Sequence, residues 1–260
     1  MSRKARERLA HREKTVERRD KVLEHDFSSE RATLEEVFDQ ATRMVIYKFL
    51  TEGVLYEVHG VVSAGKEARV YWGKTKEGKD LAVKIYLTRS AEFKKGMFKY
   101  IEGDYRFKGI KHDTRSLIFA WAQKEFRNLD QAFRAKVNVP KPLAVRNNVL
   151  IMEFIGKDGV SAPSLKEQVP ANPEKIYRLL LRYIERLYCK ADLVHGDLSE
   201  YNIMAWKGKP VVFDMSQSVP TSHPLAKSLL TRDLANVNRF FNRFGVKVLS
   251  PEEAFRQVTG

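Results

Sequence analysis

Short apolar runs separated by turn residues predict an antiparallel sheet in the first half of the chain. Residues 54–62, 68–74 and 81–86 are rich in valine, leucine and tyrosine, a composition typical of strands. Two more runs, at 144–145 and 149–154, flank an Asn-Asn dipeptide that tolerates the positive φ of a hairpin turn. The pattern therefore predicts three consecutive strands and a later hairpin.

Helical spacing of apolar residues predicts most of the other elements. Residues 33–52 carry such a pattern, and Thr33 with Glu36 forms a capping box at its start. Further helices are predicted at about 114–135 and about 225–244. The clearest stripe, which predicts a helix packed against a core, consists of Ile176, Leu179, Leu180, Tyr183, Ile184, Leu187 and Tyr188.

Two segments lack a clean period. Residues 89–115 contain three glycines and eight Lys or Arg against four Asp or Glu. A connection of this length is usually functional or disordered, so we expect a flexible insert here. Residues 195–203 are polar and irregular, which predicts a loop, and Val211–Phe213 predicts a short strand after it.

The composition excludes several classes of protein. Hydrophobic residues make up 43% of the 260 residues and aromatic residues 11%, both too high for a disordered chain. The chain shows no apolar run approaching about 18 residues, which argues against a membrane span. The first residues lack the apolar segment of a secretory signal, and the single cysteine, Cys189, excludes a disulfide framework. We therefore expect a cytoplasmic protein with no membrane partner.

The charge of the chain is strongly positive. With 47 Lys or Arg and 33 Asp or Glu, the formal net charge is +14 and the pI is about 9.7. A surplus of this size favours a polyanionic partner, most often nucleic acid. Residues 1–24 carry nine Lys or Arg and five Asp or Glu, which is typical of a solvated basic helix or of an arm on RNA.

A carboxylate, an amide and a second carboxylate follow one another at a spacing that suits phosphoryl transfer. Asp197 comes two residues after His195, Asn202 lies in the same polar loop, and Asp214 ends an apolar run. Transfer of a phosphoryl group to a hydroxyl requires one group that accepts the proton and oxygens that hold magnesium on the triphosphate. Single Asp and Asn residues are common turn formers, but the complete spacing is specific for a phosphotransferase.

A lysine within an apolar strand and a glutamate on an apolar helix face predict an ion pair. Lys84 lies in the run 81–86, where an unpaired ammonium is costly to desolvate. Glu125 shares the helix face that holds Trp121 and Leu129. Because a buried carboxylate needs a cation, we expect Lys84 to pair with Glu125 and to contact the α- and β-phosphates of a nucleotide. The alternative is a lysine that extends to the surface beside an unrelated glutamate.

The turn between the first two strands contains one glycine. Residues 63–68 read Ser-Ala-Gly-Lys-Glu-Ala, in which Gly65 permits close approach of a phosphate and Ser63 or Lys66 can contact it. The turn is neither a Walker A loop, because glutamate follows Gly-Lys, nor the three-glycine loop of ordinary protein kinases. Alone it is a weak signal, but its place ahead of Lys84 makes it informative.

The order of these motifs resembles the RIO family of atypical protein kinases. The matching segments are S-x-G-K-E-A, A-V-K, K-E-F-R-N-L, M-E-F-I, H-G-D-L-S-E-Y-N and F-D, and the resemblance covers about residues 50–245. The first of them is similar to the first (Rio-one) subfamily; the second subfamily has serine at the end of this turn and opens with a winged helix. The chain departs from the family at Ala64, where threonine is usual, which should change little because backbone amides do most of the phosphate binding.

The resemblance implies a non-specific serine/threonine kinase that also hydrolyses ATP, with ATP and Mg²⁺ or Mn²⁺ as cofactors. It implies that Asp197 accepts the proton of the substrate hydroxyl and that Asn202 and Asp214 bind the metal. In the family, the aspartate that matches Asp214 forms an aspartyl-phosphate intermediate. The implied nucleotide site includes the turn, the strand lysine and a hinge whose backbone groups bind adenine: Ser63, Gly65, Lys66, Glu67, Ala68, Lys84, Met152, Glu153 and Ile155.

The same resemblance implies an α+β fold: a reduced, two-lobed protein-kinase-like fold with an antiparallel-sheet N-lobe, a mainly helical C-lobe and N-terminal helices. Residues 1–50 are then a basic helical extension, 51–155 the N-lobe with its flexible insert at about 89–115, and 156–260 the C-lobe. Met-Ser follows Asp214 where ordinary kinases have Phe-Gly, and no A-P-E motif follows. We therefore expect neither an activation loop nor peptide-docking helices.

The family also implies a role in maturation of the small ribosomal subunit, with the pre-ribosomal particle and its RNA as partners. Two other functions stay open at this stage. The motif H-G-D-L-x4-N also occurs in small-molecule phosphotransferases, although these usually carry a larger, acidic substrate domain. The third is a non-catalytic assembly factor that binds an RNA particle, and the intact set of Lys84, Glu125, Asp197, Asn202 and Asp214 argues against it.

Overall fold

The computed structural model describes residues 38–88, 97–111 and 113–260, and contacts divide the chain into two compact units, residues 1–47 and 48–260. Helix α3 (Gln40–Thr51) spans the division. Asp39 caps its start, since Asp39 Oδ1 accepts a hydrogen bond of 2.8 Å from the backbone N–H of Thr42. The helix predicted over residues 33–52 is thus confirmed in its described part. Its predicted capping box and the basic segment at residues 1–24 lie outside the described residues.

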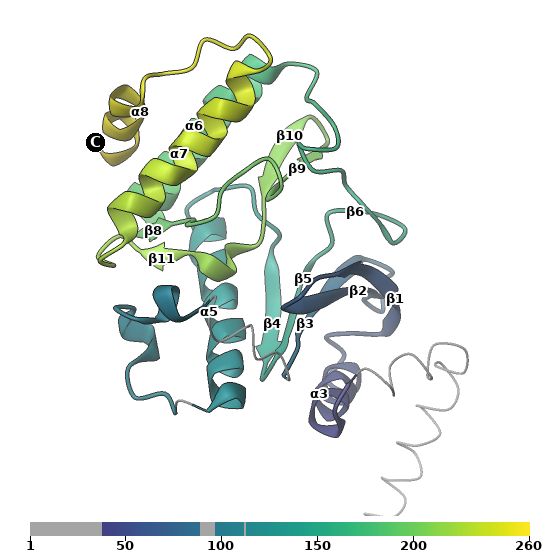
Figure 1. Ribbon diagram of the computed structural model, residues 1–260. Coiled ribbons are helices and arrows are strands. Elements are labelled where there is room, and N and C mark those ends of the chain that lie inside the picture. Colours follow the sequence, from purple (N-terminus) through teal and green to yellow (C-terminus); the bar gives the residue numbers. More distant parts are fainter. Residues whose placement is uncertain (1–37, 89–96, 112) are drawn as a thin grey trace, which may run out of the picture. The chain divides into compact units, whose positions relative to one another are not determined.

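The second unit begins with a five-stranded antiparallel sheet (Figure 1). Its strand order is β1-β2-β3-β5-β4, so the later hairpin adds to the edge formed by β3. The three consecutive strands and the hairpin predicted from the sequence are confirmed. The strands are β1 (Glu57–Ala64), β2 (Ala68–Lys74), β3 (Asp80–Tyr86), β4 (Pro142–Arg146) and β5 (Val149–Glu153).

Turn residues set the geometry of this sheet. Asn147 has a φ of 51° between β4 and β5, a left-handed conformation that asparagine adopts more readily than most residues. The strand predicted over residues 54–62 begins and ends later, and β1 runs on to Ala64. The turn into β2 is therefore shorter than predicted and occupies residues 65–67. Lys84 lies on β3, the middle strand of the sheet.

Helix α5 (Thr114–Arg134) packs against β4 and β5. Asp113 caps its first turn, because Asp113 Oδ1 accepts a hydrogen bond of 2.9 Å from the backbone N–H of Ser116. Glu125 falls on the inward face and is 0% exposed, as its place in the apolar pattern predicted. The apolar residues buried on the same helix are Ile118, Trp121, Ala122, Leu129 and Ala132.

Helix α6 (Pro173–Ala191) confirms the clearest apolar stripe of the sequence. Asn172 caps its start and is followed by Pro173, a residue whose missing N–H costs nothing at this position. Asp192 ends the helix in a left-handed conformation with a φ of 53°. Five residues of the stripe are buried: Ile176, Leu180, Tyr183, Ile184 and Leu187.

Two more helices complete the second half of the chain. Helix α7 (Ala226–Asn242) corresponds to the helix predicted at about 225–244. Helix α8 (Pro251–Thr259) was not predicted, although Ser250 and Glu253 form a capping box at its start that the sequence already displays. Both helices pack against α6.

Short two-stranded pairs flank the polar loop that carries the candidate catalytic residues. The loop lies between β8 (Leu193–Val194) and β9 (Ile203–Trp206), and β9 pairs with β10 (Lys209–Val212). The strand predicted at 211–213 is thus one arm of a hairpin. The other short elements are β6 (Gly156–Lys157), β7 (Val160–Ser161), η2 (Met215–Gln217) and β11 (Val219–Pro220), which pairs with β8.

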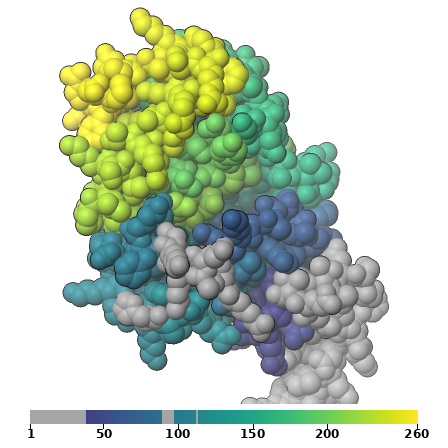
Figure 2. Space-filling view, in the orientation of Figure 1, coloured from purple at the N-terminus to yellow at the C-terminus, as the bar shows by residue number. Residues whose placement is uncertain are grey.

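The described part of the expected insert, residues 97–111, packs closely against the second unit. It contains a helical turn at residues 97–101 and the 3₁₀ turn η1 (Tyr105–Phe107). Met97 and Tyr100 are buried in the main core, and His223 Nε2 donates a hydrogen bond of 2.8 Å to the carbonyl of Glu102. Figure 2 shows this teal segment lying against the light-green residues near 220. Because apolar residues show no regular spacing over residues 89–115, the sequence did not predict this packing. The mobility of the insert stays a prediction.

One hydrophobic core extends from Tyr86 at the end of β3 through α5 to α6, α7 and α8. The α+β class predicted from the sequence is confirmed, because an antiparallel sheet and a set of helices occupy different parts of the chain. The expected boundaries after residues 50 and 155 stay predictions. Among the described residues, no helix is both long and apolar enough to cross a membrane.

Buried Asn128 of α5 joins three segments of the second unit. Its Nδ2 donates hydrogen bonds of 2.7 Å to the carbonyl of Met215 and 3.2 Å to the carbonyl of Ser218. Its Oδ1 accepts a hydrogen bond of 2.6 Å from Arg106 Nη1, and Arg106 also pairs with Asp104 at 2.7 Å. The amide therefore links α5, residues 97–111 and the segment that follows Asp214.

We expect Asn128→Ala to lower the free energy of unfolding by about 2–4 kcal/mol, because it removes three hydrogen bonds of a buried amide that join α5 to the two other segments. Urea denaturation measures this change. The matched control is Gln131→Ala on the exposed side of the same helix, which should change stability by less than about 0.5 kcal/mol. Equal stability of the two variants would show that the buried amide is not a structural link.

Candidate active site

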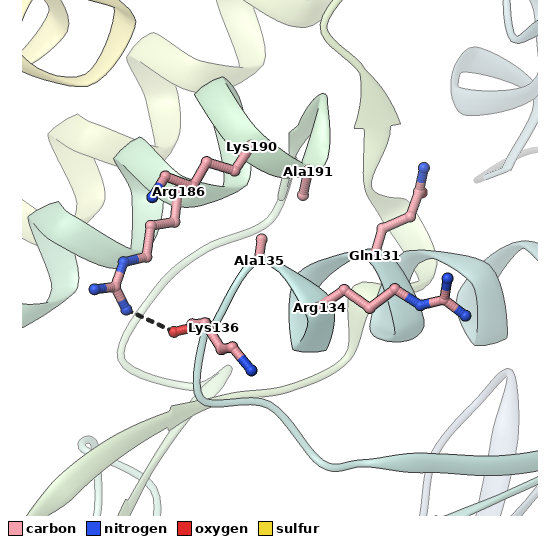
Figure 3. Close-up of a pocket in the computed structure, with 7 residues that line it drawn as sticks. All are labelled: Gln131, Arg134, Ala135, Lys136, Arg186, Lys190 and Ala191. Carbon is pink, nitrogen blue, oxygen red and sulfur yellow. Dashed lines mark hydrogen bonds between the residues drawn. The ribbon is translucent and has the colours of Figure 1, made fainter.

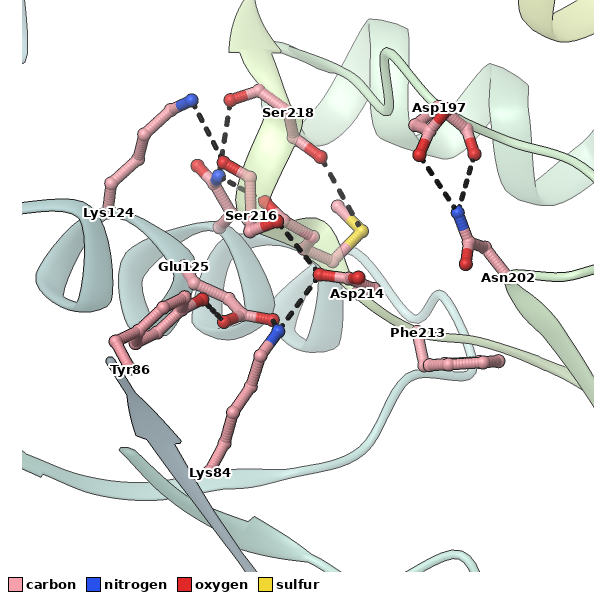
Figure 4. Close-up of polar contacts among 12 residues, drawn as sticks. Lys84, Tyr86, Lys124, Glu125, Asp197, Asn202, Phe213, Asp214, Ser216 and Ser218 are labelled. Atoms are coloured by element: carbon pink, nitrogen blue, oxygen red, sulfur yellow. Dashed lines mark hydrogen bonds and ion pairs between the residues drawn. The ribbon is translucent and has the colours of Figure 1, made fainter. Parts of the chain in front are cut away.

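The ammonium of Lys84 lies between two carboxylates from distant parts of the chain (Figure 4). Its Nζ is 2.8 Å from Glu125 Oε1 and 2.9 Å from Asp214 Oδ1. The predicted Lys84–Glu125 ion pair is therefore present, and Asp214 is a second partner. Burial lowers the pKa of Lys84, but the attraction of Asp214 and Glu125 outweighs it and raises the pKa above its usual value. Lys84 is therefore a permanent positive charge at this place.

Glu125 is the buried member of this cluster. One of its oxygens accepts from Lys84 Nζ, and the other accepts a hydrogen bond from the hydroxyl of Tyr86. Burial raises the pKa of Glu125, while the Lys84 ammonium and the hydrogen bonds oppose this shift. The Glu125 carboxylate, on α5, thus fixes the direction in which the Lys84 side chain extends from β3.

Asp214 lies two residues after the end of β10 and has a φ of 55°, which turns its side chain out of the strand direction. Its Oδ1 accepts hydrogen bonds from Lys84 Nζ and, at 2.8 Å, from Ser216 Oγ. Burial raises the pKa of Asp214, but Lys84 and the two hydrogen bonds outweigh it and bring the pKa to about 2. The side chain stays 42% exposed, so a charged carboxylate is accessible to a ligand.

The polar loop places Asp197 and Asn202 side by side. Asn202 Nδ2 donates hydrogen bonds to the carbonyl of Asp197 at 2.8 Å and to Asp197 Oδ2 at 3.3 Å. The backbone N–H of Phe213 donates to the carbonyl of Asn202 at 3.1 Å, which joins the loop to the residue before Asp214. Within the described residues, no hydrogen bond occupies Asp197 Oδ1. Partial burial raises the pKa of Asp197, and His195 opposes this shift.

His195 holds the loop against the strand that leads to Asp214. The backbone N–H of Asp197 donates to His195 Nδ1 at 3.3 Å, so the other ring nitrogen, Nε2, carries the proton and donates to the carbonyl of Phe213 at 3.1 Å. The histidine is 2% exposed. It therefore acts as a structural bridge within the motif and is not itself available to a substrate.

Asp233 of α7 anchors the polar loop at residues 195–203 through its backbone. The sequence analysis missed this residue. Its two oxygens accept hydrogen bonds from the backbone N–H groups of Gly196, at 2.7 Å, and Leu198, at 2.9 Å. Burial raises its pKa to about 6, and His195 opposes the shift. A signal for this residue was present: Asp233 lies beside Leu234 on an apolar helix face, the same kind of position that singled out Glu125.

The turn between β1 and β2 contributes a further carboxylate. Glu67 is partly buried, and burial together with the nearby Asp214 raises its pKa, whereas Lys84 lowers it. Glu67 therefore lies near enough to Asp214 and Lys84 for their charges to change its pKa, which the motif of the turn did not predict. The carbonyl of Glu67 also accepts a hydrogen bond of 2.9 Å from the N–H of Leu87, which ties the turn to the end of β3.

The remaining turn residues are placed as follows. Ser63 is exposed near the end of β1, Lys66 is exposed in the turn, and Ala68 begins β2. The N–H of Gly65 donates to the carbonyl of Ala68 at 2.9 Å. A Cβ added at Gly65 would meet that carbonyl at 3.3 Å, so the glycine keeps the turn tight without a positive φ. Whether Ser63, Gly65, Lys66, Glu67 and Ala68 contact a nucleotide stays a prediction.

Of the residues predicted as a hinge, Met152 and Glu153 end β5 and Ile155 follows it, with most of their backbone groups engaged. The N–H of Glu153 donates to the carbonyl of Lys141 at 2.8 Å, and the N–H of Ala162 donates to the carbonyl of Ile155 at 2.8 Å. Met152 is paired within the sheet. In the described chain, the N–H of Ile155 has no backbone partner. If adenine binds here, the backbone N–H of Ile155 is therefore the group that can donate a hydrogen bond to it.

The donor set at Asn202 and Asp214 fits a magnesium ion that is shared with phosphates. No three Asp, Glu, His or Cys side chains of the described residues are grouped to hold a metal by themselves. Magnesium on a nucleotide needs only one or two protein ligands, since phosphates and water supply the others. Asn202 Oδ1 and Asp214 Oδ2 have no hydrogen-bond partner in the part of the chain that the structure describes. Both oxygens can therefore act as ligands.

Comparison with known sequences gives extensive matches. A sequence model of the RIO domain matches residues 69–254. The human protein named serine/threonine-protein kinase RIO1 is 42% identical over 235 residues, which cover 89% of this chain and 41% of that protein. The RIO-type serine/threonine-protein kinase Rio1 of Methanocaldococcus jannaschii is 42% identical over 238 residues, which cover 91% of this chain and 80% of that protein. The chain thus spans less than half the length of its human relative.

Comparison with solved structures confirms the fold. The crystal structure of the Rio2 kinase from Chaetomium thermophilum matches with a TM-score of 0.62 at 23% identity, covering 82% of this chain and 66% of that chain. A second structure of that kinase, described as an ADP/Mg²⁺-phosphoaspartate complex, matches with a TM-score of 0.61 at 24% identity, covering 82% and 65%. The predicted protein-kinase-like fold is confirmed. On the domain match and its sequence relatives, this chain belongs to the RIO family, whose relatives compared above are named serine/threonine-protein kinases.

Proposed function

We propose that this chain is an ATP- and magnesium-dependent serine/threonine kinase of the cytoplasm that phosphorylates itself, hydrolyses ATP and acts in maturation of the small ribosomal subunit. The observation that carries the proposal is the Lys84 ammonium held between Glu125 and Asp214. An enzyme that transfers a phosphoryl group needs a fixed cation at the phosphates and a charged carboxylate at the metal. The names of the sequence relatives support the same activity.

The chain's own residues suffice to bind and orient a nucleotide. Lys84 supplies a cation to the phosphates, and Glu125 prevents it from turning away. Asn202 Oδ1 and Asp214 Oδ2 are the free oxygens that would hold Mg²⁺, or Mn²⁺, which accepts the same oxygen ligands. When bound, the metal neutralises the charge of the phosphates.

Asp197 is suited to accept the proton of a serine or threonine hydroxyl. Its Oδ1 is free among the described residues, while Asn202 and His195 hold the rest of the residue in place. In the proposed step, the substrate oxygen forms a bond to the γ-phosphorus, the bond to the β–γ bridging oxygen breaks, and ADP leaves with that electron pair. The hydroxyl proton passes to Asp197.

Asp214 itself is a second acceptor in this proposal. Its pKa of about 2 keeps the carboxylate charged, and its exposed oxygen can attack the γ-phosphorus to give an acyl phosphate and ADP. The structure of the Chaetomium thermophilum Rio2 kinase is described as a phosphoaspartate complex. Water that attacks the acyl phosphate completes ATP hydrolysis and restores Asp214.

The segment after Asp214 offers little to hold a peptide substrate. It forms η2 and β11 and reaches α7 at Ala226. Lys124 Nζ donates a hydrogen bond of 3.0 Å to the carbonyl of Ser216, so this segment is tied to α5. Since orientation of the attacking hydroxyl accounts for several kcal/mol of a transfer barrier, free peptides should be poor substrates.

The proposed ribosomal role rests on the family and on charge. A formal net charge of +14 favours association with an RNA particle. A small-molecule phosphotransferase has no need of such a charge.

We expect Lys84→Met and Asp214→Asn each to lower magnesium-dependent phosphate release from ATP by at least about 100-fold, because one removes the cation at the phosphates and the other a metal ligand. The matched control is Lys79→Met, an exposed lysine next to β3. Thermal unfolding curves establish that each variant is folded. Turnover within threefold of the unchanged protein in either folded variant would contradict the proposal, and no turnover in the unchanged protein would favour a non-catalytic assembly factor.

We expect self-phosphorylation and phosphate release to exceed phosphorylation of free peptides when radiolabelled ATP is followed under one set of conditions. Label on Asp214 should be released by hydroxylamine, which cleaves acyl phosphates, whereas label on serine should resist it. Asp214→Asn should abolish the hydroxylamine-sensitive fraction. Phosphorylation of an unrelated peptide at rates typical of protein kinases, about 1–100 per second, would instead indicate a conventional signalling kinase.

A further inference from the structure

A basic cavity lies where the end of α5 meets the last turns of α6 (Figure 3). Its volume is about 380 Å³, and none of its lining residues is acidic. Four of these residues are cations, Arg134 and Lys136 from the end of α5 and Arg186 and Lys190 from α6. None of the four belongs to the cluster around Lys84.

Internal contacts account for only part of this charge. Arg186 Nη1 donates a hydrogen bond of 2.7 Å to the carbonyl of Lys136, which offsets the partial negative charge at the end of α5. Arg134 pairs with Asp130 at 2.9 Å. Among the described residues, the side-chain ammonium groups of Lys136 and Lys190 have neither a hydrogen bond nor an ion pair. Two ammonium groups beside the cavity therefore remain for a ligand.

The positive charge continues along α6. Lys175, Arg178, Arg182, Arg186 and Lys190 follow one another at intervals of three or four residues, which places them on one side of the helix. At 1.5 Å per residue they span about 22 Å. A second, smaller cavity of about 230 Å³ lies at the other end of this row and is lined by the first three cations together with Asn172 and Glu174.

The length of this row decides what kind of ligand fits it. A single phosphate ion would occupy one of the two cavities and leave the other cations unused. A strand of RNA carries a negative charge on every nucleotide and can neutralise the whole row. Glu174 pairs with Arg178 and is the one acidic residue that lines either cavity, so the row has a strong positive excess.

We propose that Arg134, Lys136 and the basic side of α6 form a track that binds the phosphate backbone of RNA without reading its sequence. The proposal rests on the function proposed above, since it names the surface through which this chain holds an RNA particle. Backbone binding fits long, flexible cations and the absence of aromatic residues from both cavities.

Binding of a fluorescein-labelled 20-nucleotide RNA, measured by anisotropy against salt concentration, tests the track. The track variant combines Arg134→Gln, Lys136→Asn and Lys190→Gln; Arg186 is kept because it stabilises the end of α5. The control variant combines Arg243→Gln, Lys207→Asn and Lys247→Gln, all exposed. Lys136 and Lys207 share a left-handed backbone, with φ of 62° and 49°, which asparagine tolerates. Both variants lose three charges.

We expect the slope of the logarithm of the binding constant against the logarithm of the salt concentration to become less negative by about two in the track variant. Each lost phosphate contact changes this slope by about 0.7 for a single strand, and the variant removes three cations. At 0.1 M salt this corresponds to about 100-fold weaker binding. The control variant should bind within about threefold of the unchanged protein, and ATP hydrolysis should be equal in all three.

Other outcomes would contradict the proposed RNA track, and each points to a different alternative. Equal losses in the two variants would mean that net charge alone binds RNA. No RNA binding by the unchanged protein would remove both the track and the proposed RNA partner, while normal ATP hydrolysis would leave the kinase assignment intact. Equal competition by polyglutamate of matched charge would show that the surface takes an acidic protein segment, and competition by millimolar inorganic phosphate would show a single-anion site.

Discussion

A buried ammonium that needs two carboxylates is the constraint on which the rest of this structure depends. Lys84 is 8% exposed, and an unpaired charge at that depth would be strongly unfavourable. Its partners come from α5 and from the end of β10, so the middle strand of the sheet, the long helix and the residue after the last hairpin must meet at one point. The proposed nucleotide site therefore coincides with the contact that brings these elements together.

The segment after Asp214 shows how the chain holds this geometry in a short stretch of sequence. Lys124 donates to the carbonyl of Ser216, and Asn128 donates to the carbonyl of Met215, so two side chains of α5 fix the first turn after the aspartate. Ser216 in turn donates to Asp214. Asp214 is thus held by its own neighbours, whereas in ordinary protein kinases an activation loop follows the corresponding residue.

Much of this arrangement could be predicted because strong patterns carry it. The period of α6, the Asn147 hairpin and the isolated charges of Lys84 and Glu125 in apolar runs all have direct physical meanings. Strands of two to four residues, such as β8 and β9, have too few positions to show a period, and the packing of residues 97–111 depends on contacts with segments far away in the sequence. α8 and Asp233 were missed although their capping box and apolar helix face were visible.

The charge balance around Lys84 offers the most direct test of the account. Glu67 and Asp214 lie near one ammonium, and Glu125 keeps that ammonium from pairing with Asp214 alone. In Glu125→Gln, Lys84 should move toward Asp214 and compete with magnesium for it. The measurement is the Mg²⁺ concentration for half-maximal ATP hydrolysis, with surface Glu174→Gln as the control. We expect this concentration to rise at least fivefold, which corresponds to a change of about 1 kcal/mol in the Asp214–Lys84 interaction. An unchanged magnesium requirement and unchanged turnover in the folded variant would contradict it.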